Sequence, residues 1–261
     1  MRSGERSPLI LTVLEGIPLI RPGDDLAEIL LQALEESQIN LRDGDILVIT
    51  QKIVSKAEGR LVDLQTVSPS KQALDLADKT GKDPREVELI LEESTEVLRS
   101  RLGLIIVEHR RGFVCANAGI DHSNLDPGED NNQDLVLLLP ENPDQSAEEL
   151  RRKIETKKYV RIGVVIIDSH GRAWRVGTVG ISIGLSGLPG VVDLRGEPDL
   201  FDYRLRVTQI GAVDELAAAA SLLMGQADEG YPAVHVRGFP YHLRDGSFEE
   251  LKRDKSRDMF R

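Results

Sequence analysis

The chain has 261 residues, a formal net charge of −11, and 40% hydrophobic and 30% charged residues. This length fits one large domain or two small ones, and the negative charge argues against a non-specific nucleic-acid binder. No apolar run approaches the roughly 20 residues of a membrane span, and we recognise no signal peptide, so the cytoplasm is the expected compartment. The single cysteine, Cys115, excludes an intramolecular disulfide and lies in an apolar run, which predicts a buried thiol.

The first sixty residues predict two strands, one helix and a polar segment. The expected elements are strand 9–14, a helix from about Leu26 that Asp24 or Asp25 caps, and strand 46–50. Gln51, Lys52 and Lys56 follow the second strand directly. Two lysines four residues apart beyond a strand end are a candidate anion-binding pair, although solvated surface lysines are the commoner explanation.

Helices and short strands are expected to alternate over residues 70–156. They are helices 70–80 and 84–100, strands 104–107, 113–116 and 135–139, and a helix to about 156 that Ser146 and Glu149 open as a capping box. We interpret Glu92, Glu93 and Glu96 as a solvated helix face. An acidic, glycine-containing loop is expected over 127–133.

Polar side chains cluster just past the strand at 113–116. The segment Asn117–Asn124 includes Asp121, His122 and Ser123. Its Asn, Asp and Gly content is typical of turns. The same residues supply oxygen-bearing side chains at the end of an apolar strand, where they can also bind a ligand.

The stretch from Tyr159 to Gly190 is central to the sequence. The β-branched run Val164–Ile167 predicts a strand buried on both faces, and we expect it to stop at Asp168 and Ser169. A glycine-dense segment follows. Two interpretations stay open: a buried hairpin with an exposed turn, or a strand end that carries a carboxylate and a hydroxyl for metal or phosphate.

The last third predicts three regular elements and a tail. They are strand 204–212, a helix over 213–224 that Gly225 ends, a polar loop at 226–232, strand 233–236, and a charged tail from Pro240 without assigned chemistry.

The polar clusters together suggest a metal and phosphate site. Asp121 and Asp168 are hard oxygen ligands of the kind that magnesium and manganese prefer, and the lysines can neutralise phosphate. The sequence contains no P-loop, nucleophile-elbow or G-x-G-x-x-G motif. The histidines His122, His170, His235 and His242 form no i,i+4 metal pair and are interpreted as surface or turn residues.

Six blocks in one order resemble the coenzyme F-420-0:L-glutamate ligases, the γ-glutamyl ligases of deazaflavin coenzyme biosynthesis. The blocks are LEGIPLI at 14–20, VSKAEGR at 54–60, ILEES at 90–94, ANAGIDHSN at 116–124, GVVIIDSHGRAWRVGTVGISIG at 163–184 and LLMGQADEGYPAVHVRG at 222–238. The resemblance extends from about residue 9 to 238, and the collinear order makes it specific.

This resemblance implies an α+β fold of two interleaved lobes with mixed sheets, and an intertwined homodimer. It implies a single catalytic module over 1–261, with a core at about 9–238, a charged tail at 240–261 and no fused flavin reductase domain. The implied reaction joins L-glutamate to the terminal carboxylate of coenzyme F-420-0 or its dehydro form. GTP is the implied co-substrate, manganese or magnesium the implied metal at two sites, and potassium a further implied requirement.

The resemblance also implies roles for individual residues. The implied GTP contacts are Ile17, Pro18, Leu19, Ile20, Gln51, Lys52, Lys56, Asn124, Met224, Gly225, Gln226, Ala227, Asp228, Glu229, Gly230 and Tyr231. Asp121 and Asp168 are implied as catalytic ligands of one metal, and Ser169 with Gln226 as ligands of a second. Position 169 is Ser where Thr is familiar, which keeps the hydroxyl. Position 226 is Gln where some members have an acid, which puts the second metal in doubt.

Two other functions remain open. The chain is alternatively a nucleotide- or deazaflavin-binding protein without turnover, or a GTP-dependent ligase of the same fold that acts on another acid. The oxygen-bearing side chains at Asp121, Asp168 and Ser169 argue against loss of catalysis.

Overall fold

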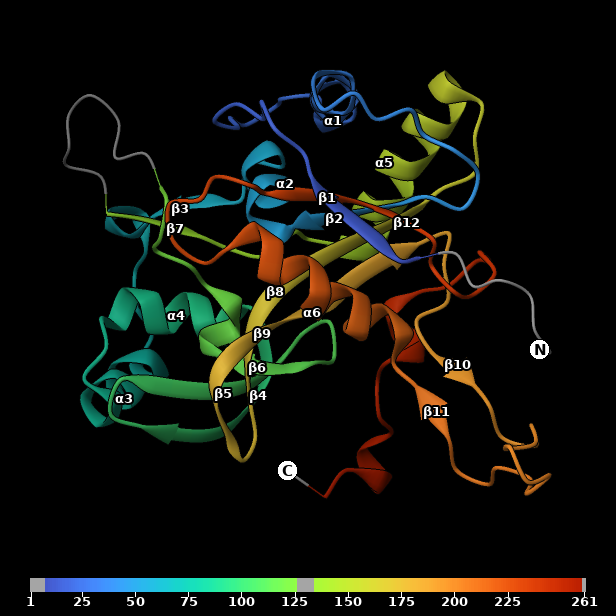
Figure 1. Ribbon diagram of the computed structural model, residues 1–261. Helices are drawn as coiled ribbons and strands as arrows, with labels where there is room; N and C mark the ends of the chain where they lie inside the picture. Colours follow the sequence, from blue (N-terminus) through green and yellow to red (C-terminus); the bar gives the residue numbers. More distant parts are fainter. Residues whose placement is uncertain (1–7, 126–133, 260–261) are drawn as a thin grey trace.

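A five-stranded mixed sheet organises the larger part of the molecule (Figure 1). The computed structural model describes residues 8–125 and 134–259, so the loop predicted at 127–133 lies outside the described residues. The strand order is β1 (Ile10–Val13), β12 (Ala233–Arg237), β2 (Ile46–Thr50), β8 (Gly163–Arg172) and β9 (Arg175–Ser186). The pair β2–β8 is parallel and the other neighbours are antiparallel.

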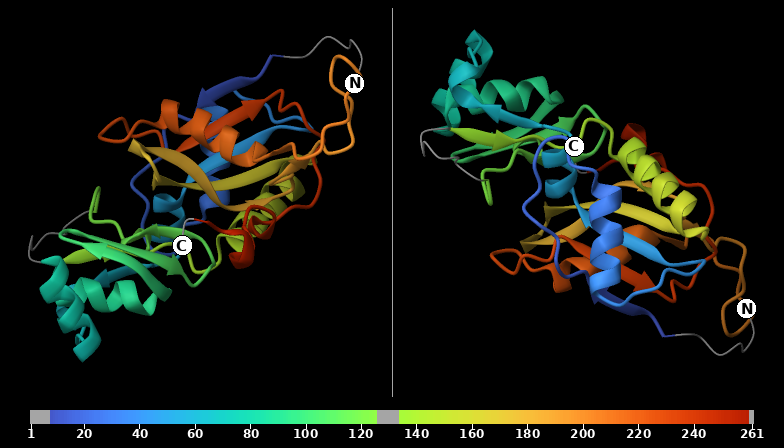
Figure 2. Two further views of the ribbon diagram at one scale, coloured as in Figure 1. Left: turned by 90° about the horizontal axis from the view of Figure 1, so that it is seen from below. Right: turned by 90° about the horizontal axis from the view of Figure 1, so that it is seen from above.

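Helices cover both faces of this sheet. α1 (Leu26–Glu36) and α5 (Pro143–Lys158) lie on one face, and α6 (Ala212–Met224) lies on the other (Figure 2). The β-branched run Val164–Ile167 is buried, as the sequence predicted, because both faces of its strand are covered. None of the helices among the described residues has the length and apolar character needed to cross a membrane.

A smaller group of elements lies beside the main sheet (Figures 1 and 2). We call residues 61–125 and 134–138 the small lobe and the remainder the main lobe. The small lobe contains β3 (Leu61–Asp63), α3 (Lys71–Thr80), α4 (Pro84–Glu92), β4 (Ser94–Arg101), β5 (Leu104–His109), β6 (Val114–Ala116) and β7 (Leu135–Leu137). Short 3-10 turns at Leu64–Thr66 and Asn117–Gly119 complete it. The structure is therefore a mixed α+β fold, while interleaving of the lobes stays a prediction.

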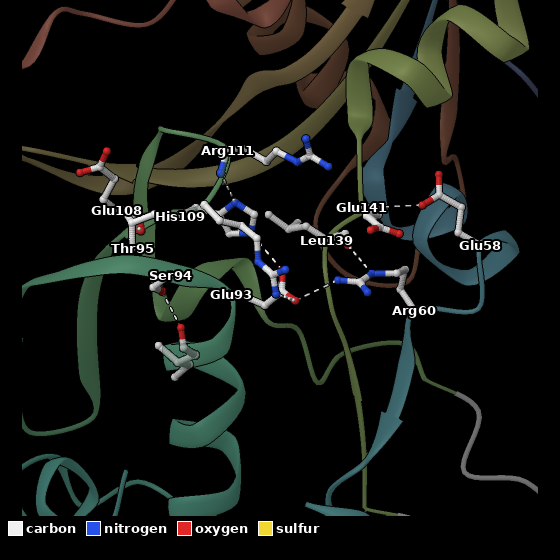
Figure 3. Close-up of polar contacts among 12 residues, drawn as sticks. Glu58, Arg60, Glu93, Ser94, Thr95, Glu108, His109, Arg111, Leu139 and Glu141 are labelled. Atoms are coloured by element: carbon white, nitrogen blue, oxygen red, sulfur yellow. Dashed lines mark hydrogen bonds and ion pairs between the residues drawn. The ribbon is translucent and has the colours of Figure 1, made fainter. Parts of the chain in front are cut away.

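The chain enters the small lobe after α2 (Gln51–Ala57) and returns before α5, and one arginine ties these two connections together. The Arg60 side chain donates to the Leu139 carbonyl oxygen (2.9 Å) and to the Glu93 carboxylate (3.1 Å), as Figure 3 shows. Glu93 also accepts from Arg110 (2.7 Å) and lies 3.5 Å from the His109 imidazole Nε2. The lobes are thus joined by a buried carboxylate and its cationic neighbours.

The region around Glu93 corrects one predicted element. The helix expected over 84–100 ends at Glu92, and Ser94–Arg101 form β4, which pairs with β5. No glycine or proline marks the change, and the apolar Val87, Ile90 and Val97 continue a helical spacing by coincidence. The interpretation of Glu93 as solvated is also wrong, because only 6% of this residue is exposed.

Three other boundaries differ from the predictions. α5 begins earlier than expected because Asn142, not Ser146, caps it, and the Ser146 hydroxyl instead donates to Glu58. The strand expected over 204–212 shrinks to β11 (Gln209–Ile210), paired with β10 (Val192–Asp193). The tail from Pro240 contains 3-10 turns at Phe248–Glu250 and Lys255–Arg257, and Phe248 is buried in the core.

Candidate functional site

A cavity of about 490 Å³ opens at one end of the strands of the main sheet. β1, β2 and β8 run in the same direction, so their carboxyl ends meet there. β12 begins at that end, and the Thr50 N–H donates to the Pro232 carbonyl oxygen (2.9 Å). The segments after β1 and β2, the middle of β8 and the loop before β12 are therefore gathered around one space. Crevices outside the carboxyl ends of strands are common ligand sites in open α/β sheets.

The structure brings every candidate residue of the sequence to this cavity. Its lining includes Ile17, Pro18, Leu19, Ile20, Gln51, Lys52, Lys56, Asp121, Asn124, Asp168, Ser169, Met224, Gly225, Gln226, Ala227, Asp228, Glu229, Gly230 and Tyr231. These residues come from five separate stretches of the chain and from both lobes. Their roles in binding stay predictions, because no ligand is present.

β8 presents Asp168 and Ser169 to opposite faces of the sheet. The strand does not stop at Asp168 as predicted, because β9 pairs with it as far as Arg172. β2 does end there, since its last residue Thr50 pairs with Ile167. Successive side chains on a strand point to opposite faces, so Asp168 and Ser169 reach the cavity from opposite faces. The hairpin interpretation and the site interpretation of this stretch are thus compatible.

Register identifies the face that each side chain uses. Ser169 pairs with Gly180, and a Cβ at Gly180 would lie 2.5 Å from the Ser221 Cβ of α6. Ser169 therefore points to the α6 face. Asp168 and His170 share the other face, on which the His170 ring contacts Phe113 of the small lobe.

Lys52 and Lys56 lie one helical turn apart on α2 rather than in a loop. Lys52 Nζ lies 2.9 Å from Asp121 Oδ2 and donates to the Ser123 hydroxyl (2.7 Å). Lys56 Nζ donates to the Asn124 carbonyl oxygen (2.7 Å). Through these contacts the two lysines of α2 hold the polar segment 121–124 of the small lobe beside the cavity.

Asp121 is an ionised carboxylate in this environment. Burial would raise the pKa of Asp121, but the hydrogen bonds from Lys52 and from the Ser123 N–H outweigh it and lower the pKa below its usual value of 3.8. The Ser123 N–H donates to Asp121 Oδ1 at 2.7 Å. A carboxylate kept charged next to Lys52 is suited to hold a cation or to direct that lysine toward phosphate.

Asp168 has a different partner. The His170 imidazole Nε2 lies 2.9 Å from Asp168 Oδ2, and His170 is only 7% exposed. The interpretation of His170 and His235 as surface or turn histidines is therefore wrong. His235 is buried as well and contacts Asp45 at the opposite end of the sheet (2.9 Å). Buried histidines beside carboxylates cannot be distinguished from surface ones in a sequence without helical or metal-binding spacing.

The loop from Gly225 to Pro232 closes one side of the cavity. Gly225 and Gly230 both have a φ of 74°, a backbone conformation that favours glycine. The Asn124 side-chain amide donates to the Ala227 carbonyl oxygen (3.3 Å), and Glu229 accepts from the Ala227 N–H (2.8 Å). Gln226 donates to the Ser221 hydroxyl (3.2 Å). The loop is thus linked to the small lobe across the cavity.

The donor set fits a hard divalent cation in its chemistry. Within residues 8–125 and 134–259, no group of three or more His, Cys, Asp and Glu side chains is arranged to hold a metal. The predicted ligands are two carboxylates, one hydroxyl and one amide, all of them oxygen donors around one cavity. Oxygen donors suit magnesium and manganese.

Sequence reasoning missed several residues of the cavity. Thr50, Ile53, Ser123, Ile167, Ser221 and Pro232 also line it. Ser123 stands inside the quoted block at 116–124, beside Asp121, and its hydroxyl was the available signal. The sequence contains no comparable signal for Ser221, because this residue lies in an alanine-rich helix whose packing on Gly180 is not visible in the sequence. Cys115 is buried as predicted, and burial raises the pKa of its thiol to about 12.

Comparisons with known proteins agree on one family. The family model described as F420-0:Gamma-glutamyl ligase matches residues 16–238. Relatives named coenzyme F420:L-glutamate ligase include a protein of Methanothermobacter thermautotrophicus, 49% identical over 95% of this chain and 96% of its own length. Proteins with the same name are 47% identical in Methanopyrus kandleri, over 95% of this chain and 97% of that protein, and 42% identical in Methanocaldococcus jannaschii, over 94% of each.

Proposed function

Because the chain belongs to the F420-0:gamma-glutamyl ligase family, we propose that it joins L-glutamate to the terminal carboxylate of coenzyme F-420-0, or its dehydro form, at the expense of GTP. The family and its relatives make the chain a ligase of F-420 biosynthesis. The GTP dependence, the acyl-phosphate route and the identity of the acceptor are the proposal. The observation that carries it is the convergence of lysines and carboxylates from both lobes on one cavity.

The chemistry requires an activated acyl group. A carboxylate is a poor acyl donor, because its leaving group would be oxide. In the proposed first step a carboxylate oxygen of the precursor attacks the γ-phosphorus of GTP, and GDP leaves. The glutamate amine then attacks the acyl carbon, phosphate leaves, and the amine loses a proton.

Residues of the chain have distinct tasks in this scheme. Lys52 and Lys56 lie on the cavity side of α2 and offset the negative charge of the phosphates. Asp121, Asp168, Ser169 and Gln226 would hold the divalent metals, which supply further charge neutralisation when bound. Asp168 and Ser169 reach the cavity from opposite faces of β8, which supports their assignment to two different metals.

The loop at 225–232 is proposed to exclude water from the acyl phosphate. Its contact with Asn124 bridges the cavity between the lobes, and its two glycines give it backbone freedom at both ends. Lids of this kind sequester a reactive intermediate until the second substrate arrives.

A homodimer, a potassium requirement and a cytoplasmic location complete the proposal. Exposed apolar side chains support self-association. Leu200 is 96% exposed and Phe201 89% exposed on the segment between β10 and β11, and Trp174 is 89% exposed at the tip of the β8–β9 hairpin. Large apolar side chains exposed to this degree are candidates for contact with a second copy of the chain.

One incubation tests the function. The protein is mixed with GTP, manganese, L-glutamate and coenzyme F-420-0, and the products are analysed by mass spectrometry. The γ-glutamyl product together with GDP is the expected result. GTP binding without product would indicate a binding protein, and a product only with a different acid would indicate another ligase.

Asp168→Asn is the corresponding test of the site. The amide keeps the shape and the hydrogen-bonding position of the carboxylate but removes its charge, so the fold should persist while metal-dependent GTP turnover is lost. Turnover at the parental rate in saturating manganese would exclude Asp168 as a metal ligand.

A further inference from the structure

We propose that His170 is a positioning residue for Asp168: its imidazole holds one carboxylate oxygen so that the other is presented to a metal in the cavity. The inference rests on the proposed function, which makes Asp168 a metal ligand. It adds a residue that does not line the cavity and acts only through Asp168.

The contact between the two side chains is direct and buried. His170 Nε2 lies 2.9 Å from Asp168 Oδ2, and the side chains are 8% and 17% exposed. A carboxylate oxygen accepts hydrogen bonds, so the His170 tautomer with its proton on Nε2 donates to Asp168 Oδ2 in this contact. Across the described parts of the chain, His170 is the single hydrogen-bond partner of the Asp168 side chain. Oδ2 is therefore committed to His170, and Oδ1 is available for another ligand.

The imidazole itself is held from the small lobe. The ring of Phe113 lies 5.7 Å from the His170 ring, and Phe113 in turn stacks on His109 with a centroid distance of 4.8 Å and an interplanar angle of 4°. Phe248 meets Phe113 edge-on at 5.5 Å. Burial and this ring contact restrain the orientation of the imidazole and therefore the direction in which Nε2 points.

Fixing the carboxylate has a chemical consequence. Partners in the outer shell of a metal site orient the ligands, and their loss typically costs about 10–100-fold in metal affinity. Asp121, the other predicted carboxylate ligand, is fixed by Lys52 and by the Ser123 N–H. His170 gives Asp168 a comparable restraint from within the main lobe.

The test replaces His170, which donates the hydrogen bond, and leaves the proposed metal ligand Asp168 unchanged. In His170→Gln the side-chain amide places an N–H at the distance of Nε2, so the donor is retained. In His170→Asn the amide is too short to reach Oδ2, and in His170→Leu the donor is removed. Binding of Mn²⁺ alone is measured from the electron paramagnetic resonance signal of the free ion, with circular dichroism as the check on folding.

The chain also contains a matched control. His235 and Asp45 form a buried pair with the same 2.9 Å distance between Nε2 and Oδ2, at the opposite end of the sheet. His235→Leu removes a buried imidazole that lies beside a carboxylate, as His170 does, but it does not touch the cavity. It separates a general loosening of the fold from an effect on Asp168.

The expected result is a loss of Mn²⁺ affinity of about tenfold or more in His170→Asn and His170→Leu, with His170→Gln close to the parent and His235→Leu unchanged. If the leucine variant does not fold, the asparagine variant decides. Parental Mn²⁺ affinity in a folded His170→Asn protein would overturn the inference, as would an equal loss in His235→Leu. If Asp168→Asn also binds Mn²⁺ like the parent, the metal assignment of the proposed function fails together with it.

Discussion

At the scale of single residues, the charge of α2 decides how an acidic protein accepts a polyanion. The chain has a formal net charge of −11, so a triphosphate is repelled unless cations are concentrated locally. Lys52 and Lys56 provide that concentration, and both are already directed to the cavity by contacts with residues 121–124. The lysines are therefore partly ordered before a nucleotide binds, which lowers the entropy that binding must overcome.

Lys56→Ala tests this role. We expect GTP affinity to fall by about tenfold, because a charge-assisted hydrogen bond contributes roughly 1.5–3 kcal/mol. The loss should be larger at low salt, where screening is weaker. Isothermal titration calorimetry at two salt concentrations measures both effects.

Lys158→Ala is the matched control for that measurement. Lys158 lies on α5, contacts Glu35 at 2.9 Å and does not line the cavity, so its removal changes the net charge equally. Equal GTP affinities for the Lys56 variant and the parent would reject the assignment. Equal losses in both lysine variants would show an effect of net charge alone.

At the scale of elements, the agreement between sequence and structure depends on whether the pattern is local. The bounds of β2 (Ile46–Thr50) were predicted because an apolar run of strand length follows Asp43-Gly44. The start of α1 was predicted from Asp24 and Asp25, and the structure selects Asp25, which accepts from the Ala27 N–H. Capping and strand signals of this kind involve residues that are neighbours in the chain.

The failures involve partners that are distant in the chain. β8 continues past Asp168 because β9 supplies its hydrogen bonds. The sequence of residues 168–172 does not by itself predict this pairing. Glu93 is buried because Arg60 and Arg110 neutralise it, and these arginines lie 33 and 17 residues away. The site residues were identified through the family resemblance, whereas their convergence at one end of the strands follows from strand directions that the sequence alone does not fix.

The loop at 225–232 is the element on which retention of the intermediate is proposed to depend. Proline fixes φ near −65°, whereas Gly230 has a φ of 74°, so Gly230→Pro forces the loop out of its present conformation. We expect phosphate release from GTP to persist while glutamate ligation falls several-fold, because water then reaches the acyl phosphate. Phosphate and ligated product are measured side by side.

Gly196→Pro provides the comparison for that loop. Gly196 also has a positive φ, 89°, and lies on the segment between β10 and β11, away from the cavity. Its variant should keep phosphate release and ligation in the parental ratio. If Gly230→Pro loses both activities in equal proportion, or neither, the loop is not the barrier to water.

At the scale of the whole molecule, the site depends on how the two lobes are held together. Asp121 belongs to the small lobe and Asp168 to the main lobe, so the distance between the two carboxylates is set by the packing of one lobe on the other. The buried Glu93 joins both chain connections through Arg60 and lies beside His109 (Figure 3). The His109 ring in turn stacks on Phe113. The stability of this junction is therefore a property that catalysis requires.

The Glu93 carboxylate also makes this junction sensitive to acid. Burial would raise the pKa of Glu93, but the neighbouring His109 imidazole and the charges of Arg60 and Arg110 lower it below its usual value of 4.5. A carboxylate whose folded pKa is below its unfolded pKa stabilises the fold at pH values above the unfolded pKa. That contribution is lost as the pH falls from about 4.5 through the folded pKa.

Glu93→Gln should therefore destabilise the protein in a pH-dependent manner. At pH 7 we expect the free energy of unfolding to fall by about 2–4 kcal/mol, because the variant removes the buried anion that Arg60 and Arg110 contact. As the pH falls from about 4.5 through the folded pKa, the parent loses this contribution by protonation, so the difference between the two proteins should shrink. Urea unfolding at pH 7, 5 and 3.5 measures the difference.

The adjacent Glu92 is exposed, and Glu92→Gln should match the parent at each pH. A difference between Glu93→Gln and the parent that stays constant from pH 7 to 3.5 would mean that the charge of Glu93 does not stabilise the junction, and that its shape alone does.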